Sequence, residues 1–206
     1  MKRTIVFDND GTLYKVPEEF QLAVIEKMHS YLANLLGVSS ETIQTLRLNL
    51  LKKHDTESTC KSFNLEYGID SEEFEKNSFL AVDPSFFMGR DEKLIYTLEN
   101  FVAKKIILTN NPSSFARGIL ETLGVASFFD FILGEKEIDY KHKPNLHAFL
   151  CADKFCAGDK FMVEDNAKNL VVARKMGYKT VYVGEPVDDH VFDYQIKDIY
   201  GMGVIK

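Results

Sequence analysis

The chain has 206 residues, of which 45% are hydrophobic and 27% are charged, and it carries a formal net charge of −6. This composition allows a sizeable core and lacks the bias of disordered, collagen-like or coiled-coil chains. The acidic balance also argues against a nucleic-acid polymer as partner, because phosphate backbones are bound by clustered Lys and Arg.

Several features of the sequence bear on the compartment. The N-terminal stretch MKRTIVFDND reaches its first carboxylate too soon for a signal peptide, and no segment reaches the roughly 18 apolar residues of a membrane span. Cys60, Cys151 and Cys156 lack the spacing of a zinc site or a CxxC redox motif, which favours reduced thiols. We therefore expect a cytoplasmic protein without a membrane partner.

Five short apolar segments, each ended by polar residues or glycine, predict buried β-strands. They are residues 3–8, 104–110, 130–134, 160–165 and 179–184. Helical patterns lie between them, and strands that alternate with helices indicate a parallel sheet covered on both faces. The sequence therefore predicts an α/β fold with a Rossmann-like, doubly wound parallel sheet.

Start and stop signals mark a helix after the second of these strands. Asn111 is a suitable N-cap, Pro112 fits the first helical position, and Gly124 follows the last turn. The tail from residue 188 onward has no assigned element. Five of its apolar side chains nevertheless suggest a packed end of the domain: Phe192, Tyr194, Ile196, Ile199 and Tyr200.

Residues 17–80 contain no convincing strand and have helical periodicity. Apolar residues repeat at helical spacing up to Gly37 and again beyond it. These are Phe20, Val24, Met28, Tyr31 and Leu35, followed by Ile43, Leu46 and Leu50. We therefore expect a helical second domain at residues 16–85, inserted into an α/β core domain that consists of residues 1–15 and 86–206.

Four polar clusters lie where the predicted strands end or in the loops that follow them. They are Asp8 to Thr12, Thr109 to Asn111, Lys143 to Asn145 and Glu164 to Asn166. In an open parallel sheet the ligand crevice lies outside the carboxyl ends of the strands. We therefore expect the four clusters to converge on one pocket.

The first cluster holds two carboxylates two residues apart, Asp8 and Asp10, and Gly11 lets the chain turn directly after them. One carboxylate can attack a phosphate ester while the other handles the proton. A phosphate dianion repels an unaided carboxylate, so this attack needs a divalent cation and fixed hydrogen-bond donors. Asp165, with Glu164 as a further candidate, would supply the oxygen ligands that Mg²⁺ prefers.

Thr109 and Lys143 are candidates to hold the phosphoryl oxygens, and Lys143 would also balance the crowded acids. Taken alone, the acid pair could be simple turn chemistry, and Thr109 could cap a helix. Lys143 alone could be a solvated lysine, with Lys141 beside it as an equal candidate. The occurrence of all four clusters together favours catalysis over these structural alternatives.

Four motifs occur in a characteristic order between residue 4 and about residue 184: FDNDGTLY, ILTNNP, KPN and VEDNAKN. They resemble the nucleophile, second, lysine and acidic motifs of the haloacid dehalogenase-like superfamily of phosphatases. The resemblance implies that Asp8 forms an aspartyl-phosphate, and that Asp10 protonates the leaving oxygen and then activates water. It implies that Asp8, the Asp10 main-chain carbonyl and Asp165 bind Mg²⁺. The substrate-binding residues that it implies are Thr109, Asn110 and Lys143.

The resemblance also favours a phosphatase over a dehalogenase, because dehalogenase members need no leaving-group acid and this chain has Asp10. The helical insertion lies where the superfamily places its type 1 cap, a mobile lid that selects substrate. FDNDGTLYK, this cap and EDNAKN most resemble the pyrimidine 5′-nucleotidase-like branch, which acts on nucleoside monophosphates. Four cations of the insertion could face such a substrate or simply be solvated: Lys52, Lys53, His54 and Lys61.

The sequence thus predicts a magnesium-dependent hydrolase of a small-molecule phosphate monoester, with a nucleoside 5′-monophosphate as the first candidate substrate. A sugar phosphate, or a phosphoglucomutase-like transfer of the phosphoryl group to a sugar, requires the same chemistry and stays open. The non-enzymatic alternatives are a phospho-regulatory receiver domain and a catalytically silent binding protein. A receiver domain is typically shorter, has its acid pair in a different strand from its phosphorylated Asp and lacks a helical insertion, which disfavours the first alternative. The complete set of chemical residues disfavours the second, whereas the fold alone would not.

Overall fold

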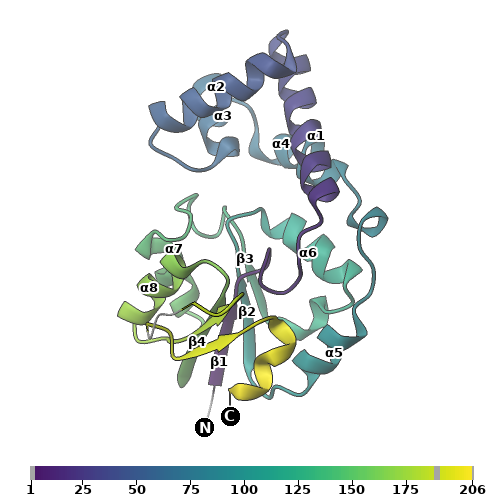
Figure 1. The fold of residues 1–206 in the computed structure, drawn as a ribbon. Coiled ribbons are helices and arrows are strands. Elements are labelled where there is room, and N and C mark those ends of the chain that lie inside the picture. The colour runs from purple at the N-terminus through teal and green to yellow at the C-terminus, as the bar shows by residue number, and fades with distance from the viewer. Residues whose placement is uncertain (1–2, 188–190, 206) are drawn as a thin grey trace.

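The computed structural model, which describes residues 3–187 and 191–205, contains one sheet of six strands (Figure 1). Along the chain these are β1 (Arg3–Phe7), β2 (Lys104–Leu108), β3 (Phe131–Leu133), β4 (Asp159–Glu164), β5 (Lys179–Val183) and β6 (Tyr194–Ile196). Their order across the sheet is β3-β2-β1-β4-β5-β6, and every neighbouring pair is parallel. The predicted Rossmann-like α/β fold is therefore confirmed.

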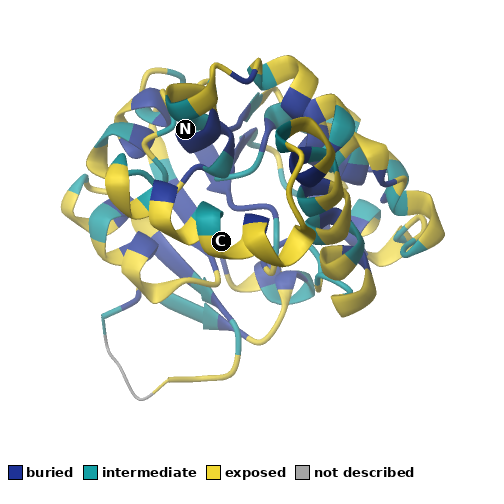
Figure 2. Ribbon diagram, turned by 90° about the horizontal axis from the view of Figure 1, so that it is seen from above, coloured by how far each residue is buried: buried dark blue, intermediate teal, exposed yellow. Residues whose placement is uncertain are grey.

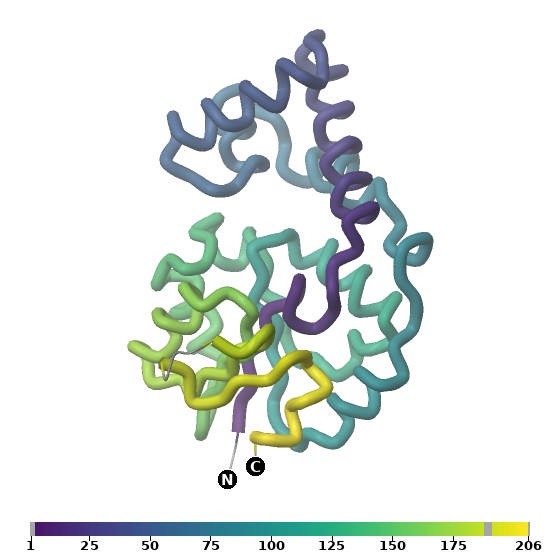
Figure 3. Tube along the Cα trace, in the orientation of Figure 1, coloured from purple at the N-terminus to yellow at the C-terminus, as the bar shows by residue number. Residues whose placement is uncertain are grey.

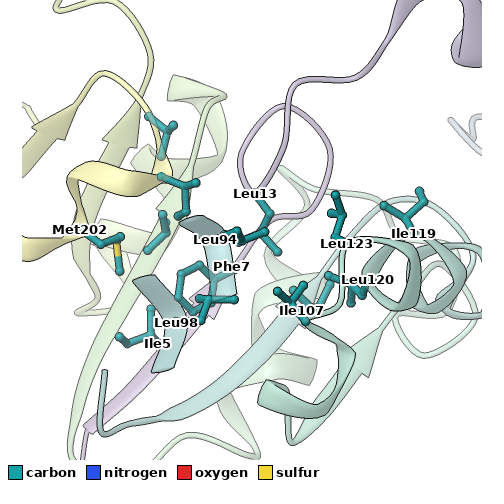
Figure 4. Close-up of a cluster of buried hydrophobic side chains, with 14 of the residues drawn as sticks. Ile5, Phe7, Leu13, Leu94, Leu98, Ile107, Ile119, Leu120, Leu123 and Met202 are labelled. Carbon is teal, nitrogen blue, oxygen red and sulfur yellow. The ribbon is translucent and has the colours of Figure 1, made fainter. Parts of the chain in front are cut away.

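Helices cover both faces of this sheet. They are α5 (Glu92–Glu99), α6 (Ser113–Thr122), α7 (Leu146–Asp153) and α8 (Ala167–Lys175). Because successive strand residues point to opposite faces, Ile5 and Phe7 of β1 pack against α5 and α6, while Val6 packs against α7 and α8. Figure 4 shows the first of these cores, where Leu94 and Leu98 of α5 approach Phe7. Burial on both faces explains why the strands are apolar runs.

Figure 2 shows the same division of burial from above, with buried strands inside and exposed helix surfaces outside. Among the described residues, none of the helices combines the length and the hydrophobicity that crossing a membrane requires. Cys60 and Cys151 are buried and Cys156 is half-buried, and all three are free thiols, as predicted.

Between β1 and β2 the chain leaves the sheet, forms a group of helices and returns (Figure 3). The helices are α1 (Glu18–Leu36), α2 (Ser40–Lys53), α3 (Thr59–Tyr67) and α4 (Ser71–Asn77), followed by short 3₁₀ turns at Phe79–Ala81 and Pro84–Phe86. Their inner faces form a core cluster of their own, which includes Ile43, Phe63 and Phe74. As predicted, residues 17–80, all of them described, contain no strand.

Local signals set the ends of these helices. Gly37 ends α1 in the left-handed conformation, at φ 66°. The Ser39 side chain then accepts a hydrogen bond from the Thr42 N–H and caps α2. One prediction for α1 is wrong: Leu35 is 51% exposed, and Leu32 lies in the core instead. The buried face of α1 instead contains Phe20, Val24, Met28 and Leu32. A spacing of four residues keeps these side chains on one side, because the helix completes a turn in about 3.6 residues.

Helix α6 begins one residue later than predicted. Pro112 occupies the N-cap position, and its predecessor Asn111, expected to be the N-cap, directs its side-chain amide to Asp10. The short strand β6 was not predicted, because three residues carry too little periodicity to identify a strand. Phe192 and Ile199 are buried near it, as expected of a packed tail, while residues 188–190 lie outside the described part.

We expect Ile43→Ala to lower the free energy of unfolding by about 2–5 kcal/mol, because this side chain is fully buried in the helical cluster. Leu48→Ala on the same helix is the matched control. Leu48 is 61% exposed, so its truncation should change stability by less than about 0.5 kcal/mol. Denaturant titration measures both variants, and equal losses would contradict the packing of α2.

Candidate active site

The predicted polar clusters meet at one edge of the sheet, where the parallel strands end. Asp8 directly follows β1, Thr109 follows β2, and Glu164 ends β4. Strand β1 lies between β2 and β4 in the sheet, so the first and last of these residues flank the point where the strand order reverses. Such a switch point is where open α/β sheets bind ligands.

Lys143 is buried at the centre of this edge. Its Nζ lies 2.7 Å from Asp8 Oδ1 and 2.7 Å from Glu164 Oε2. Burial alone would lower the pKa of Lys143, but the charges of Asp8 and Glu164 outweigh it and raise the pKa above the ordinary value. Lys141 is exposed, so the geometry selects Lys143 from the two candidates.

Asn110 holds the main chain of Lys143. The Asn110 Nδ2 donates to the Lys143 carbonyl at 3.1 Å, and its Oδ1 accepts from the Lys143 N–H at 2.8 Å. These two hydrogen bonds fix the loop that contains Lys143 against the end of β2. The substrate contact expected of Asn110 therefore stays a prediction, because its side-chain amide already has these two partners.

Asp8 is 7% exposed and carries an unusual protonation equilibrium. Burial raises its pKa to about 6, with a further contribution from the charge of Glu164, while Lys143 opposes both effects. The Thr12 hydroxyl lies 3.3 Å from Asp8 Oδ2 and 3.3 Å from Asp165 Oδ1, so it connects the ends of β1 and β4.

Asp10 is surrounded by hydrogen-bond donors. The Tyr14 hydroxyl and the Asn111 Nδ2, the latter at 3.0 Å, both donate to its carboxylate, and Thr109 Oγ1 lies 3.5 Å away. Burial, followed by the charge of Asp8, raises the pKa of Asp10. Sequence reasoning missed Tyr14, and it placed Asn111 in the second polar cluster without identifying it as a partner of Asp10. Both stand inside the quoted motifs, which is the signal that could have identified them.

Three acids form the candidate metal centre. Carboxylate oxygens of Asp8, Glu164 and Asp165 lie within 4.8 Å of one another. These oxygen donors are the type that Mg²⁺ prefers, and their charge exceeds that of Lys143. A Cβ at Gly11 would lie 2.4 Å from Asp165 Oδ2, so any other residue at position 11 would clash with this carboxylate. The donor set therefore fits a divalent cation.

Both oxygens of Glu164 accept hydrogen bonds, and two of the donors come from its own motif. Oε2 accepts from Lys143 Nζ and from Asn169 Nδ2 at 2.9 Å, and Oε1 accepts from the Asn166 N–H at 3.1 Å. Asn169 belongs to the last motif but was not predicted as a site residue. Its contact makes Glu164 a fixed counter-charge for Lys143.

A cavity of about 300 Å³ opens beside Asp10, between the strand ends and the helical segment. Arg47 is the cation of α2 that lines it. Of the four cations considered in the insertion, Lys52 is exposed, and Lys53 and His54 both contact Glu66, at 2.6 and 2.9 Å. Lys61 lies over the Tyr140 ring.

Residues 5–183 match the sequence model of a protein family described as haloacid dehalogenase-like hydrolase. The chain belongs to this family. The superfamily inferred from the four motifs is therefore confirmed, and with it a hydrolase that acts on a small-molecule substrate. Haloacid dehalogenase-like hydrolases generally use Mg²⁺, which agrees with the buried acid cluster. Among curated proteins, no sequence matches the chain.

Solved structures show the same fold over nearly the whole chain. A HAD phosphatase from Thermococcus onnurineus is 22% identical with a TM-score of 0.67, covering 100% of this chain and 97% of the other. A 2-haloacid dehalogenase from Pseudomonas syringae pv. Tomato DC3000 is 19% identical with a TM-score of 0.69, covering 99% and 97%. A magnesium-bound HAD hydrolase from Bacillus subtilis is 16% identical with a TM-score of 0.58, covering 96% and 95%.

We expect the metal-free protein to lose stability as the pH rises from about 4 to about 6. The pKa of Asp8 is about 6 in the folded protein against an ordinary 3.8, so its ionisation over this range favours the unfolded chain, by up to about 3 kcal/mol. Asp8→Asn should remove this loss. Thermal midpoints of the metal-free parent and variant across this range test it, and parallel pH profiles would contradict it.

Gly11→Ala should disturb Asp165 beyond the ordinary cost of a left-handed alanine. Gly11 and Gly177 have φ near +80°, but only at Gly11 would a Cβ meet a neighbour, the Asp165 carboxylate. Each substitution should cost about 1–3 kcal/mol through backbone strain, and Gly11→Ala alone should also weaken Mg²⁺ binding. The shift of the thermal midpoint with added Mg²⁺ measures this affinity. An equal shift in the two variants would exclude the steric effect on Asp165.

Proposed function

We propose that this protein is a magnesium-dependent phosphatase that hydrolyses a small phosphate monoester through an aspartyl-phosphate on Asp8. One observation supports this most directly: the Lys143 ammonium group lies 2.7 Å from both Asp8 and Glu164, with hydrogen-bonded Asp10 beside them. The arrangement joins a nucleophile, an acid and a fixed cation in one buried site.

The reaction proceeds in two displacements. The Asp8 carboxylate attacks phosphorus, the ester P–O bond breaks, and Asp10 gives its proton to the departing oxygen. Asp10 then takes a proton from water as that water attacks the aspartyl-phosphate, which releases phosphate and restores Asp8. Lys143 and the Thr109 hydroxyl orient the phosphoryl oxygens during both steps.

The raised pKa of Asp10 supports its role as the acid. Burial and the neighbouring Asp8 favour the protonated form that must donate in the first step. A departing halide would need no proton, so an acid at position 10 whose pKa is raised by burial and by Asp8 favours a phosphatase over the dehalogenase chemistry of the structural neighbour. The hydrogen bonds from Tyr14 and Asn111 oppose that rise only in part.

Asp8, Asp165 and the Asp10 main-chain carbonyl are the proposed metal ligands. When bound there, Mg²⁺ acts as a Lewis acid that offsets negative charge on the phosphoryl group. Glu164 has a different proposed role, which is to hold the Lys143 ammonium group in place. Its own carboxylate is fixed by further hydrogen bonds from the Asn169 side chain and the Asn166 N–H.

We further propose that residues 16–85 form a cap domain over a core of residues 1–15 and 86–206. The cavity supports this division, because helix α1 and strand-end residues line it together. A nucleoside 5′-monophosphate, as in the pyrimidine 5′-nucleotidase-like branch, and a sugar phosphate are the first substrates to compare. Transfer of the phosphoryl group to a sugar is the variant of the same chemistry.

Phosphate release from nucleoside monophosphates and sugar phosphates, with and without Mg²⁺, tests the proposal. We expect release by the parent only with Mg²⁺, no release by Asp8→Asn, and a loss of about 10²–10⁴-fold in kcat for Asp10→Asn. Asp159→Asn is the matched control, because Asp159 lies at the amino end of β4 with only a 3.9 Å ion pair.

Three outcomes would count against this function. Halide release from a 2-haloacid without phosphate release would indicate a dehalogenase. Full activity of Asp8→Asn would exclude the aspartyl-phosphate. A folded, magnesium-loaded parent that releases phosphate from none of these esters would favour a binding role.

A further inference from the structure

The cavity beside Asp10 has two chemically different walls. One wall is apolar and includes Phe20 and Val24 of α1 together with Phe115 of α6. The other is polar and includes Arg47 of α2 and Glu135 from the loop after β3. A leaving group attached to a phosphate at Asp8 would extend into this space, because Asp10 lines the same cavity.

Glu135 is a buried carboxylate that the proposed mechanism does not use. It is 3% exposed, and its Oε2 accepts from Ser58 Oγ at 2.7 Å and lies 3.3 Å from His142 Nε2. Its other oxygen, Oε1, is buried without a hydrogen-bond partner among the described residues. Native proteins rarely bury an unpartnered carboxylate oxygen, so this atom indicates a missing donor.

Arg47 presents the opposite charge to the same cavity. It is half-buried, and its Nε donates to Thr59 Oγ1 at 3.1 Å. Within residues 3–187 and 191–205, no carboxylate forms an ion pair with it. The guanidinium group therefore keeps free donors for an acceptor on a ligand.

We infer that Glu135 and Arg47 form a leaving-group subsite for a neutral, hydroxyl-rich group, namely a sugar or polyol. A hydroxyl can donate to Glu135 Oε1, and a second hydroxyl can accept from Arg47. A second phosphate would meet repulsion at Glu135 and at Glu57, which also lines the cavity, and an amine would meet repulsion at Arg47. The apolar wall packs against the carbon skeleton.

This inference rests on the proposed phosphatase function and adds its specificity. A hydrocarbon leaving group of the same length would fill the cavity but leave both charges without partners. Sites built to hydrogen-bond a substrate hydroxyl discriminate strongly against analogues that lack it, because their buried polar groups are then unpaired.

The test compares two phosphate esters with five-carbon leaving groups, ribose 5-phosphate and n-pentyl phosphate. We expect the magnesium-loaded parent to prefer ribose 5-phosphate in kcat/KM, and Glu135→Gln to reduce this preference about tenfold or more, mainly through KM. Arg47→Gln should reduce the same ratio, which provides a second variant if the first fails to fold. Glu121→Gln, on the exposed side of α6, is the matched control and should change nothing.

Ser58→Ala separates substrate recognition from a structural role. It removes the hydrogen bond to Glu135 Oε2 and the N-cap of α3 but leaves the Glu135 carboxylate present, so it should affect both esters by the same factor. A preference ratio that is unchanged in both Glu135→Gln and Arg47→Gln would overturn the subsite, as would a parent that does not prefer ribose 5-phosphate. Phosphate release from neither these esters nor the wider panel would overturn the phosphatase proposal itself.

Discussion

Lys143 is buried with its ammonium group between Asp8 and Glu164, and removing these three charges from water is costly unless each is held by fixed partners. Those partners come from every motif of the chain. Asn110 holds the lysine main chain, and Asn169 holds Glu164. These hydrogen bonds from two motif asparagines, together with the ion pairs, fix Lys143, Asp8 and Glu164 relative to one another.

The same charges make the site a weak point in the stability of the metal-free protein. Asp8 is ionised at neutral pH against its raised pKa, and Asp10 lies beside it in a similar environment. A rigid parallel sheet can tolerate this cost because its strands are buried on both faces and hold the loops in place. The excess of carboxylates among Asp8, Glu164 and Asp165 is the feature of the strand ends that would favour a divalent cation.

Under the proposed function, the residues that act on phosphorus and those that contact the leaving group are separate sets. The proposed catalytic residues lie at or near strand ends of the sheet, whereas the proposed leaving-group contacts come from both parts of the structure, with Arg47 in the helical insertion and Glu135 in the loop after β3. Contacts such as the one from Ser58 to Glu135 join the two parts directly across the cavity. Substitutions in the insertion can therefore change the substrate without changing the chemistry.

The sequence by itself determined the α/β class, the helical insertion and the four polar clusters, because apolar strand segments, helix caps and the motifs are all local signals. It did not identify Asn111 as a partner of Asp10, since the same residue also fits a helix cap. The link between Ser58 and Glu135 joins residues 77 positions apart. Only the tertiary structure decided such contacts, because they depend on how the insertion packs against the sheet, and no local pattern encodes that arrangement.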